Sequence, residues 1–357
     1  MANVANRGSK PMKQPLKTFP PYGRMVAEFE ERLGSGGPPD DWRSGVNWTS
    51  WRDNLENLIA AVLWPTYDFD ALTWRGAAAA RIAGLTEADF RLFESLRPVL
   101  KTDVPNLAKP ISHFAMFQLE DHPEDKLEHD AGVDRGVDLT LRKYLEGGAD
   151  QLTIDTLAHW IESGMMRKAG SLPVQVKRHL QRPRAFQVSD SLGEGWFTHH
   201  QALQSPSPSM ISGHAFKGCT LGIAGFYHAT ALGCTPRVFD ALARLTVDFG
   251  DRRVFAGVHY PSDNLGSWIA AMLICEHVCA DGGRLGRAFL WQAISTKSTV
   301  YGSIADAIGK NLAPEHKPAF NLLNELGENP EMGIDEALAC AEQQVRPKPE
   351  SLAVAAE

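Results

Sequence analysis

The sequence predicts an all-α protein, organised as a helical bundle. Apolar residues recur at the spacing of amphipathic helices in several segments of the 357-residue chain. Proline and glycine interrupt the chain between these segments, and no segment shows the strict alternation of a strand. The chain has no internal repeat, and helices of this kind bury their apolar stripes against one another.

Several of the expected helices have residues suited to start or end them. Thr49 or Ser50 is placed to cap the first helix, while Pro173 and Pro261 suit the first turns of two others. Gly233 follows a long segment rich in small residues and is expected to end it. The expected helices cover residues 48–63, 86–96, 154–169, 173–180, 212–232, 237–255 and 261–279.

Composition and motif position divide the chain into four parts. A start rich in Lys, Pro and Gly predicts a flexible N-terminal arm over residues 1–40. A helical N-terminal extension packed on the core is expected over residues 41–150, and a catalytic helical core over residues 151–300. Residues 301–357 are expected to form a C-terminal helix and a loose tail.

The balance of charge excludes several function classes. The chain is 43% hydrophobic and 22% charged, with a formal net charge of −7, an ordinary globular balance. This charge exerts no general attraction on nucleic acid or acidic membranes, so an anion site must be built from local charge. The cysteines are odd in number and scattered, which predicts small core residues in place of a disulfide framework.

No segment has the features of a targeting signal or a membrane span. The basic residues near the N-terminus are not followed by an apolar stretch. The apolar runs at residues 221–232 and 268–275 are interrupted or shorter than the roughly 20 residues that a span needs. We therefore expect a cytoplasmic protein without a transmembrane segment, and homo-oligomerisation is left open.

Three segments carry chemistry, and the first is a basic stretch from Lys177 to Arg184. Four Lys or Arg side chains lie within its eight residues. Lys177 and Arg184 are seven positions apart, which on a helix returns them to one face. Alone, such a stretch is more typical of a solvated helix end than of a binding site.

The second segment is a proline-rich loop that delivers Ser212, Gly213 and His214 to the start of a long expected helix. Free backbone N–H groups and the positive end of the helix dipole gather at such a start, which suits an anion. Gly213 would let the backbone approach that anion closely. In isolation, a capping serine followed by a surface histidine is the more common arrangement.

The third segment holds Arg253, His259 and Asp263. The guanidinium of Arg253 can fork onto two oxyanion oxygens. His259 and Asp263 are four positions apart at the start of an expected helix, a spacing that permits a carboxylate–imidazole hydrogen bond. Such a bond fixes the tautomer and leaves the other ring nitrogen free to attack. Because three separate segments suit the same chemistry, we expect one oxyanion site.

Together these segments resemble the signature of the phosphatidic acid phosphatase type 2 / vanadium haloperoxidase superfamily. That signature is Lys, six residues and Arg-Pro; then Pro-Ser-Gly-His; then Ser-Arg, five residues, His, three residues and Asp. The resemblance covers residues 150–280 or so and implies a bundle of the acid phosphatase/vanadium haloperoxidase type. The matching residues are Lys177, Arg184, Ser212, Gly213, His214, Arg253, His259 and Asp263.

The chain departs from the signature at three places. Proline follows Arg182, whereas Ala185 follows Arg184, so each arginine is a candidate anion ligand and the spacing favours Arg184. Ile211 stands in place of the proline before Ser-Gly-His, and Arg252 stands where the family usually has serine. None of these changes removes a reacting group.

The resemblance implies a phosphatase that requires no metal and acts on a small phosphate ester. His259 would attack phosphorus, Asp263 would orient it, and His214 would protonate the leaving oxygen and then activate water. The phosphoryl oxygens would be held by Lys177, Arg184, Ser212, Gly213 and Arg253.

The same cradle implies a second reaction class. Vanadate bonded to His259 would serve as a prosthetic group for the oxidation of halide by hydrogen peroxide. The short interval between His214 and His259 favours the phosphatase, whereas the long N-terminal extension favours the haloperoxidase. A third class, an idle oxyanion-binding protein, is disfavoured because every reacting group is present.

Other histidines give a weaker signal. The acidic stretch of residues 119–130 holds His122 and His129 and is expected to be a solvated loop in preference to a metal site. His199 and His200 precede the Ser-Gly-His loop, and we interpret them as loop residues in preference to additional acid–base groups.

Overall fold

Helices dominate the part of the chain that the structure describes, so the predicted all-α class is confirmed. Among the described residues, extended pairing is confined to a short antiparallel ladder of β1 (Tyr67–Asp68) and β2 (Thr73–Trp74). The computed structural model describes residues 47–64, 67–68, 73–74, 84–93, 96, 145, 149–163, 172–185, 208–255, 259–279 and 281–345.

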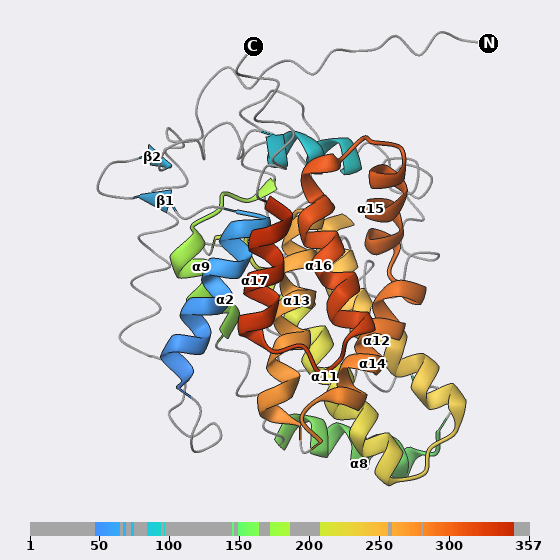
Figure 1. Cartoon of the computed structure of the whole chain (residues 1–357). Coiled ribbons are helices and arrows are strands. Elements are labelled where there is room, and N and C mark those ends of the chain that lie inside the picture. Colours follow the sequence, from blue (N-terminus) through green and yellow to red (C-terminus); the bar gives the residue numbers. More distant parts are fainter. Residues whose placement is uncertain are drawn as a thin grey trace, which may run out of the picture.

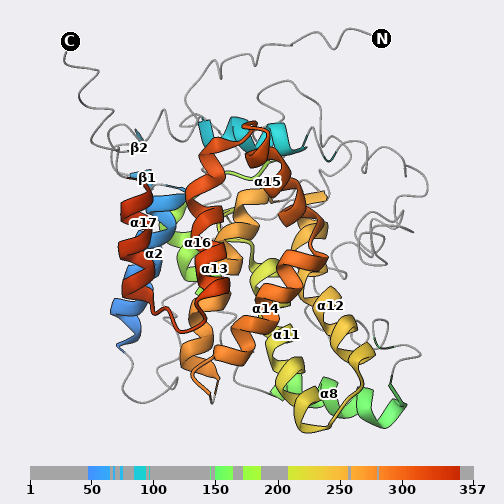
Figure 2. The same ribbon diagram turned by 45° about the vertical axis from the view of Figure 1, so that its right-hand side comes forward.

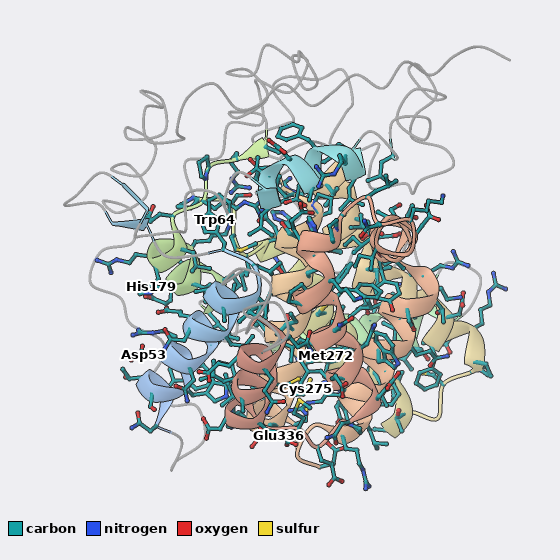
Figure 3. The ribbon with its side chains drawn as sticks, turned by 45° about the horizontal axis from the view of Figure 1, so that its top comes forward. Asp53, Trp64, His179, Met272, Cys275 and Glu336 are labelled. Carbon is teal, nitrogen blue, oxygen red and sulfur yellow. The ribbon has the colours of Figure 1, made fainter. Side chains whose placement is uncertain are left out.

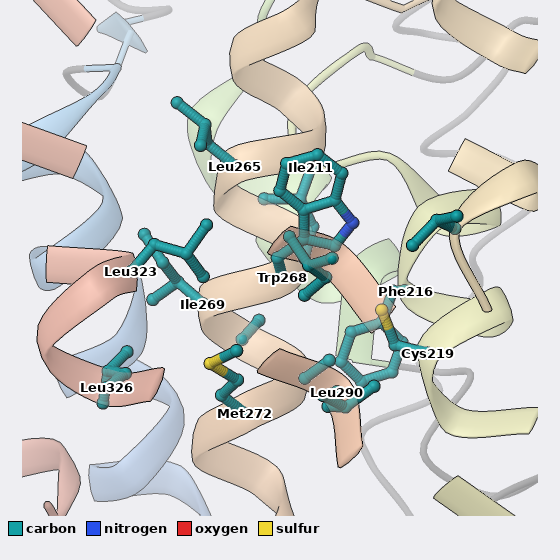
Figure 4. Close-up of a cluster of buried hydrophobic side chains, with 14 of the residues drawn as sticks. Ile211, Phe216, Cys219, Leu265, Trp268, Ile269, Met272, Leu290, Leu323 and Leu326 are labelled. Carbon is teal, nitrogen blue, oxygen red and sulfur yellow. The ribbon is translucent and has the colours of Figure 1, made fainter. Parts of the chain in front are cut away.

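The bundle is built around α13 (Pro261–Val278), whose residues are buried from Pro261 to Cys275. A helix that is apolar on all sides belongs inside a protein. Trp268 and Met272 lie among apolar side chains from neighbouring helices (Figure 4). Those neighbours are α11 (Gly213–Ala231), α12 (Pro236–Phe255), α14 (Arg284–Lys297) and α16 (Lys317–Glu328) (Figures 1 and 2).

The helices α11 and α12 form an antiparallel hairpin in close contact. The chain turns at Gly233, whose φ of 64° is left-handed. A Cβ added at Gly218 would lie 2.5 Å from the carbonyl oxygen of Thr246, and one at Gly222 would overlap the Thr246 side chain. These two glycines therefore allow a backbone approach that larger residues would block, and the start of α11 stays beside the end of α12.

The first described helix, α2 (Trp48–Val62), begins two residues before the start that a cap at Thr49 would give. The side chain of Asn47 accepts a hydrogen bond from Ser50 N at 3.1 Å and caps the helix. The expectation of Thr49 or Ser50 as the cap is wrong, because both residues lie within the first helical turn. A capping side chain must precede the N–H group that it accepts from by two or three residues.

Two shorter helices overlap the expected segments of residues 154–169 and 173–180, although residues 164–169 lie outside the described part of the chain. α8 (Gln151–Ser163) packs against α11, and α9 (Leu172–Leu180) packs against α2. Pro173 lies in the first turn of α9, as expected. The helix of residues 84–93 overlaps the segment of residues 86–96 that was expected to be helical and begins two residues before it.

The C-terminal region contains more helix than expected. Its helices are α15 (Thr299–Gly309), α16 and α17 (Ile334–Val345), with the short 3₁₀ helix η4 (Pro314–His316) between the first two. The expectation of a single helix is wrong because prolines at 314 and 330 divide the region, and each piece has its own buried stripe. α17 packs against α2, so both ends of the described chain cover one flank (Figures 1 and 2).

The cysteines behave as the composition predicts. All of them are free, and Cys219, Cys275 and Cys279 are buried. Among the described helices, none combines the length and the apolar character of a membrane span. The expected N-terminal arm, the acidic stretch of residues 119–130 and the tail after residue 345 lie outside the described residues.

Candidate active site

The site lies where the N-terminal turns of α11 and α13 meet. Ser212 N donates to Asp263 O over 3.3 Å, and Ser267 Oγ donates to Ser212 O and to Asp263 O over 2.8 Å. These contacts hold the two helix starts side by side. Each start carries backbone N–H groups and the positive end of a helix dipole, which together favour an anion.

His259 and Asp263 form the hydrogen-bonded pair that their spacing predicts. His259 Nδ1 lies 2.9 Å from Asp263 Oδ2, and both side chains are buried. The same carboxylate oxygen accepts from Tyr260 N at 2.9 Å, which fixes it at the start of α13. Burial raises the pKa of Asp263, but Arg182 and the bond from His259 lower it by more, so the carboxylate is ionised.

The second ring nitrogen of His259 faces a cation. Arg184 Nη1 donates to His259 Nε2 over 2.8 Å. A guanidinium can only donate, so we assign the lone pair to Nε2 and the hydrogen to Nδ1. Burial lowers the pKa of His259 well below its ordinary value, and Arg184 and Lys177 lower it further, against the opposing effect of Asp263. His259 is therefore a neutral imidazole with a nucleophilic nitrogen turned toward positive charge.

Lys177 and Arg253 extend this positive side. Lys177 Nζ donates to Ser209 O over 2.9 Å, and the side chains of Lys177, Arg184 and Arg253 are only 5%, 3% and 2% exposed. Burial lowers the pKa of Lys177 well below its ordinary value, as do Arg184 and Arg253, while Asp263 raises it. Both arginines thus lie close enough to act on Lys177. We call Lys177, Arg184 and Arg253 the cationic cradle.

Lys177 and Arg184 reach this site without sharing a helix face. The helix α9 ends at Leu180, Gln181 has a left-handed φ of 51°, and residues 182–184 are not helical. The expectation of a common helical face is wrong because Pro183 disfavours helical backbone at the residue before it and cannot donate a helical hydrogen bond. Arg184 therefore approaches His259 from a loop.

Arg182 binds the second oxygen of the Asp263 carboxylate. Its Nη1 donates to Asp263 Oδ1 over 3.0 Å and its Nη2 donates to Asp89 Oδ2 over 2.7 Å. The guanidinium carbon lies 3.7 Å from the ring centre of Tyr260 and 4.5 Å from that of Trp64, which follows α2 (Figure 3). With carboxylates at its edge and rings at its faces, Arg182 is less suited to bind an anion than Arg184, which donates to His259.

The residues of the Ser-Gly-His segment form the start of α11. Ser212 Oγ accepts from Ala215 N at 3.2 Å as the helix cap, and a hydroxyl that accepts can also donate. A Cβ added at Gly213 would meet Pro173 at an ordinary 3.9 Å, so no close packing with the described residues demands glycine here. His214 is the second helical residue, and its side chain is half-buried, unlike that of His259.

Ser209 is a site residue that the sequence reasoning missed. Its Oγ donates to Asp263 Oδ2 and lies 3.4 Å from His259 Nδ1, and the side chain is fully buried. The residue follows Pro208 in the loop that leads to Ser212. A Pro-Ser pair is common in loops, so this signal alone is too weak to identify it.

Several histidines considered from the sequence lie outside the described residues. These are His122, His129, His199 and His200, and the side chain of Arg252 is also outside them.

Comparison of the chain with known protein families, with characterised proteins and with solved structures finds no significant match.

Proposed function

We propose that the chain is a metal-independent phosphatase that hydrolyses small phosphate monoesters through a phosphohistidine, in a bundle of the acid phosphatase/vanadium haloperoxidase type. The observation that carries the proposal is the neutral His259, whose Nε2 faces the cationic cradle while its Nδ1 is bonded to Asp263. A nucleophile with its lone pair directed at a cluster of cations is suited to attack the centre of an anion.

The charge of the cradle supports an anionic substrate. Two guanidinium groups and the Lys177 amine are enclosed together, and burial, followed by repulsion from the arginines, lowers the pKa of Lys177. A phosphate bound among them would relieve this repulsion and restore the lysine to its charged form. It would also accept the hydrogen bond that Arg184 directs to His259 Nε2, which would free that nitrogen for attack.

The reaction then follows in two balanced steps. Nε2 of His259 forms a bond to phosphorus as the bond to the alcohol oxygen breaks, and His214 donates a proton to that oxygen. Asp263 stabilises the positive charge that the imidazole gains. In the second step His214 takes a proton from water, the water oxygen attacks phosphorus, and the phosphorus–nitrogen bond breaks to release phosphate and His259. The cradle, Ser212 and the Gly213 N–H hold the phosphoryl oxygens through both steps.

The burial of the cradle favours a second candidate, a vanadium-dependent haloperoxidase. An enclosed site retains its anion, as a permanently bound group requires. Vanadate has the charge and shape of phosphate, and His259 with the three cradle residues would hold it. When bound, it would supply Lewis-acid activation of hydrogen peroxide for the oxidation of halide.

A paired assay on one preparation separates these candidates. Release of p-nitrophenol from p-nitrophenyl phosphate, inhibited by vanadate, supports the phosphatase. Bromination of monochlorodimedone that requires vanadate and peroxide supports the haloperoxidase. Tight phosphate binding without either reaction would support an oxyanion-binding protein.

The nucleophile is tested by His259→Ala, which should abolish turnover while the fold is retained. The matched control is His228→Ala, which removes a half-buried histidine from the far end of α11 and should leave the rate unchanged. A His259→Ala variant with a near wild-type rate would refute the assignment.

A further inference from the structure

A second polar network lies behind Asp263, on the side away from His259. It joins Asp89 from the helix of residues 84–93, Arg182 from the loop after α9, Ser262 from α13 and His316 from η4. The four side chains are at most 1% exposed. Asp89 and His316 both lie outside the region that carries the family resemblance.

The contacts in this network run in series, each through a different atom. His316 Nε2 lies 2.8 Å from Asp89 Oδ1, and Asp89 Oδ2 accepts from Arg182 Nη2 at 2.7 Å. Arg182 Nη1 then donates to Asp263 Oδ1 over 3.0 Å, and Asp263 Oδ2 bonds His259 Nδ1. The orientation of each group is thus set by the one before it.

A branch through Ser262 fixes the middle of the series. Ser262 N and Ser262 Oγ donate to the two carboxylate oxygens of Asp89 over 3.1 Å and 2.6 Å. Burial raises the pKa of Asp89, but His316 and Arg182 lower it by more, so the carboxylate is ionised. Asp89 is therefore a fixed negative charge on the far side of Arg182.

Stability alone does not account for such a network. Buried ion pairs often contribute no more to stability than well-packed apolar side chains of similar volume. Ionic groups do fix one orientation, since each hydrogen bond must be satisfied in a defined geometry. The group at the end of this series is the carboxylate that sets the tautomer of His259.

We infer that Asp89 and His316 are positioning residues of the site, which act through Arg182 on the carboxylate of Asp263 and so on the aim of His259 Nε2. Asp89 also neutralises part of the positive charge of Arg182. Without it, Arg182 would act on Asp263 alone and weaken the support that Asp263 gives to a positively charged imidazole. The inference rests on the proposed function only in naming phosphorus as the atom that His259 Nε2 attacks.

The first test is Asp89→Asn, compared with Asp251→Asn. Both replace a buried carboxylate, but the carboxylate of Asp251 accepts its hydrogen bonds from Ser298 and Thr299 at the start of α15. We expect Asp89→Asn to lower kcat by about 10- to 100-fold with little change in KM, the usual cost of a misdirected reacting group. Asp251→Asn should keep both constants.

The second test is spectroscopic and does not require turnover. In the full-length protein, ¹⁵N NMR of the imidazoles should show His259 protonated at Nδ1, with a downfield proton from the bond to Asp263. Asp89→Asn should shift or broaden this signal and mix the two tautomers, while Asp251→Asn should not. This readout remains valid if the wild-type protein turns over none of the substrates tested, so failure of the proposed function is distinguished from failure of this inference.

His316 supplies an independent pair of variants if Asp89→Asn does not fold. His316→Gln keeps a donor near the position of Nε2, whereas His316→Leu removes it. The inference predicts a wild-type His259 signal in His316→Gln and an altered one in His316→Leu. Wild-type His259 signals in a folded Asp89→Asn or His316→Leu protein would overturn it.

Discussion

Removal of each of the two arginines in the loop after α9 should have a different effect, on stability for Arg182 and on anion binding for Arg184. Arg182→Ala would leave Asp89 and Asp263 as buried carboxylates without their shared cation. Breaking a buried pair in this way costs about 3–5 kcal/mol, a large share of the roughly 5–15 kcal/mol that stabilises a typical domain. At about 2–4 °C per kcal/mol for larger domains, the melting temperature should fall by roughly 6–20 °C.

Arg184→Ala should instead preserve the fold and weaken anion binding. Its guanidinium points at His259 Nε2 and lies beside Lys177, so its removal relieves repulsion within the cradle. A hydrogen bond to a charged partner contributes about 1.5–3 kcal/mol, which corresponds to a roughly 10- to 150-fold loss of affinity.

Thermal unfolding and titration calorimetry with phosphate or vanadate measure the two effects on the same samples. A stable Arg182→Ala protein, or an Arg184→Ala protein with wild-type anion affinity, would refute the roles assigned to the two arginines.

Three further predictions follow from packing and charge. Gly222→Ala should destabilise the protein by about 1–3 kcal/mol, because the added Cβ would overlap Thr246. Gly302→Ala should stabilise it by about 0.5–1 kcal/mol, because its added Cβ would meet no atom within 4 Å. Urea unfolding that ranks the two variants in the opposite order would contradict the close contact between α11 and α12. Burial raises the pKa of Asp251 to about 7, so wild type should lose stability relative to Asp251→Asn as the pH rises from the unfolded pKa near 4 to about 7, and a constant difference would contradict the shift. Phosphate affinity should fall as the pH rises through the lowered pKa of Lys177, and calorimetry should find that Lys177→Gln binds more weakly but without this decline; equal pH profiles would exclude the lysine.

The sequence predicted those parts of the site that depend on short spacing. His259 and Asp263 are four positions apart, and a helix start brings such residues into contact whatever surrounds them. Arg184 contacts His259, although the chain leaves the helix before it and the shared helical face with Lys177 that the spacing predicts does not form. The number of residues between Lys177 and Arg184 limits how far apart their side chains can lie, but it does not determine the backbone conformation between them.

The remaining contacts depend on how distant segments pack, and no local pattern encodes that. Asp89 and His316 are separated by 227 positions, and each alone resembles an ordinary polar residue in a helix or loop. Ser209 is close to the signature in sequence, but its contact with Asp263 spans 54 positions. By contrast, the division of the C-terminal region at Pro314 and Pro330 has a local cause, because proline interrupts a helix.

The meeting of two helix starts at Ser212 and Asp263 has a consequence for the descent of such proteins. Peptide groups supply part of the attraction for negative charge, and no exchange of side chains removes them. If the site binds an oxyanion as proposed, these peptide groups would still attract it after the loss of one histidine or arginine. A change of reaction on such a scaffold would then require fewer substitutions than the origin of a new binding site.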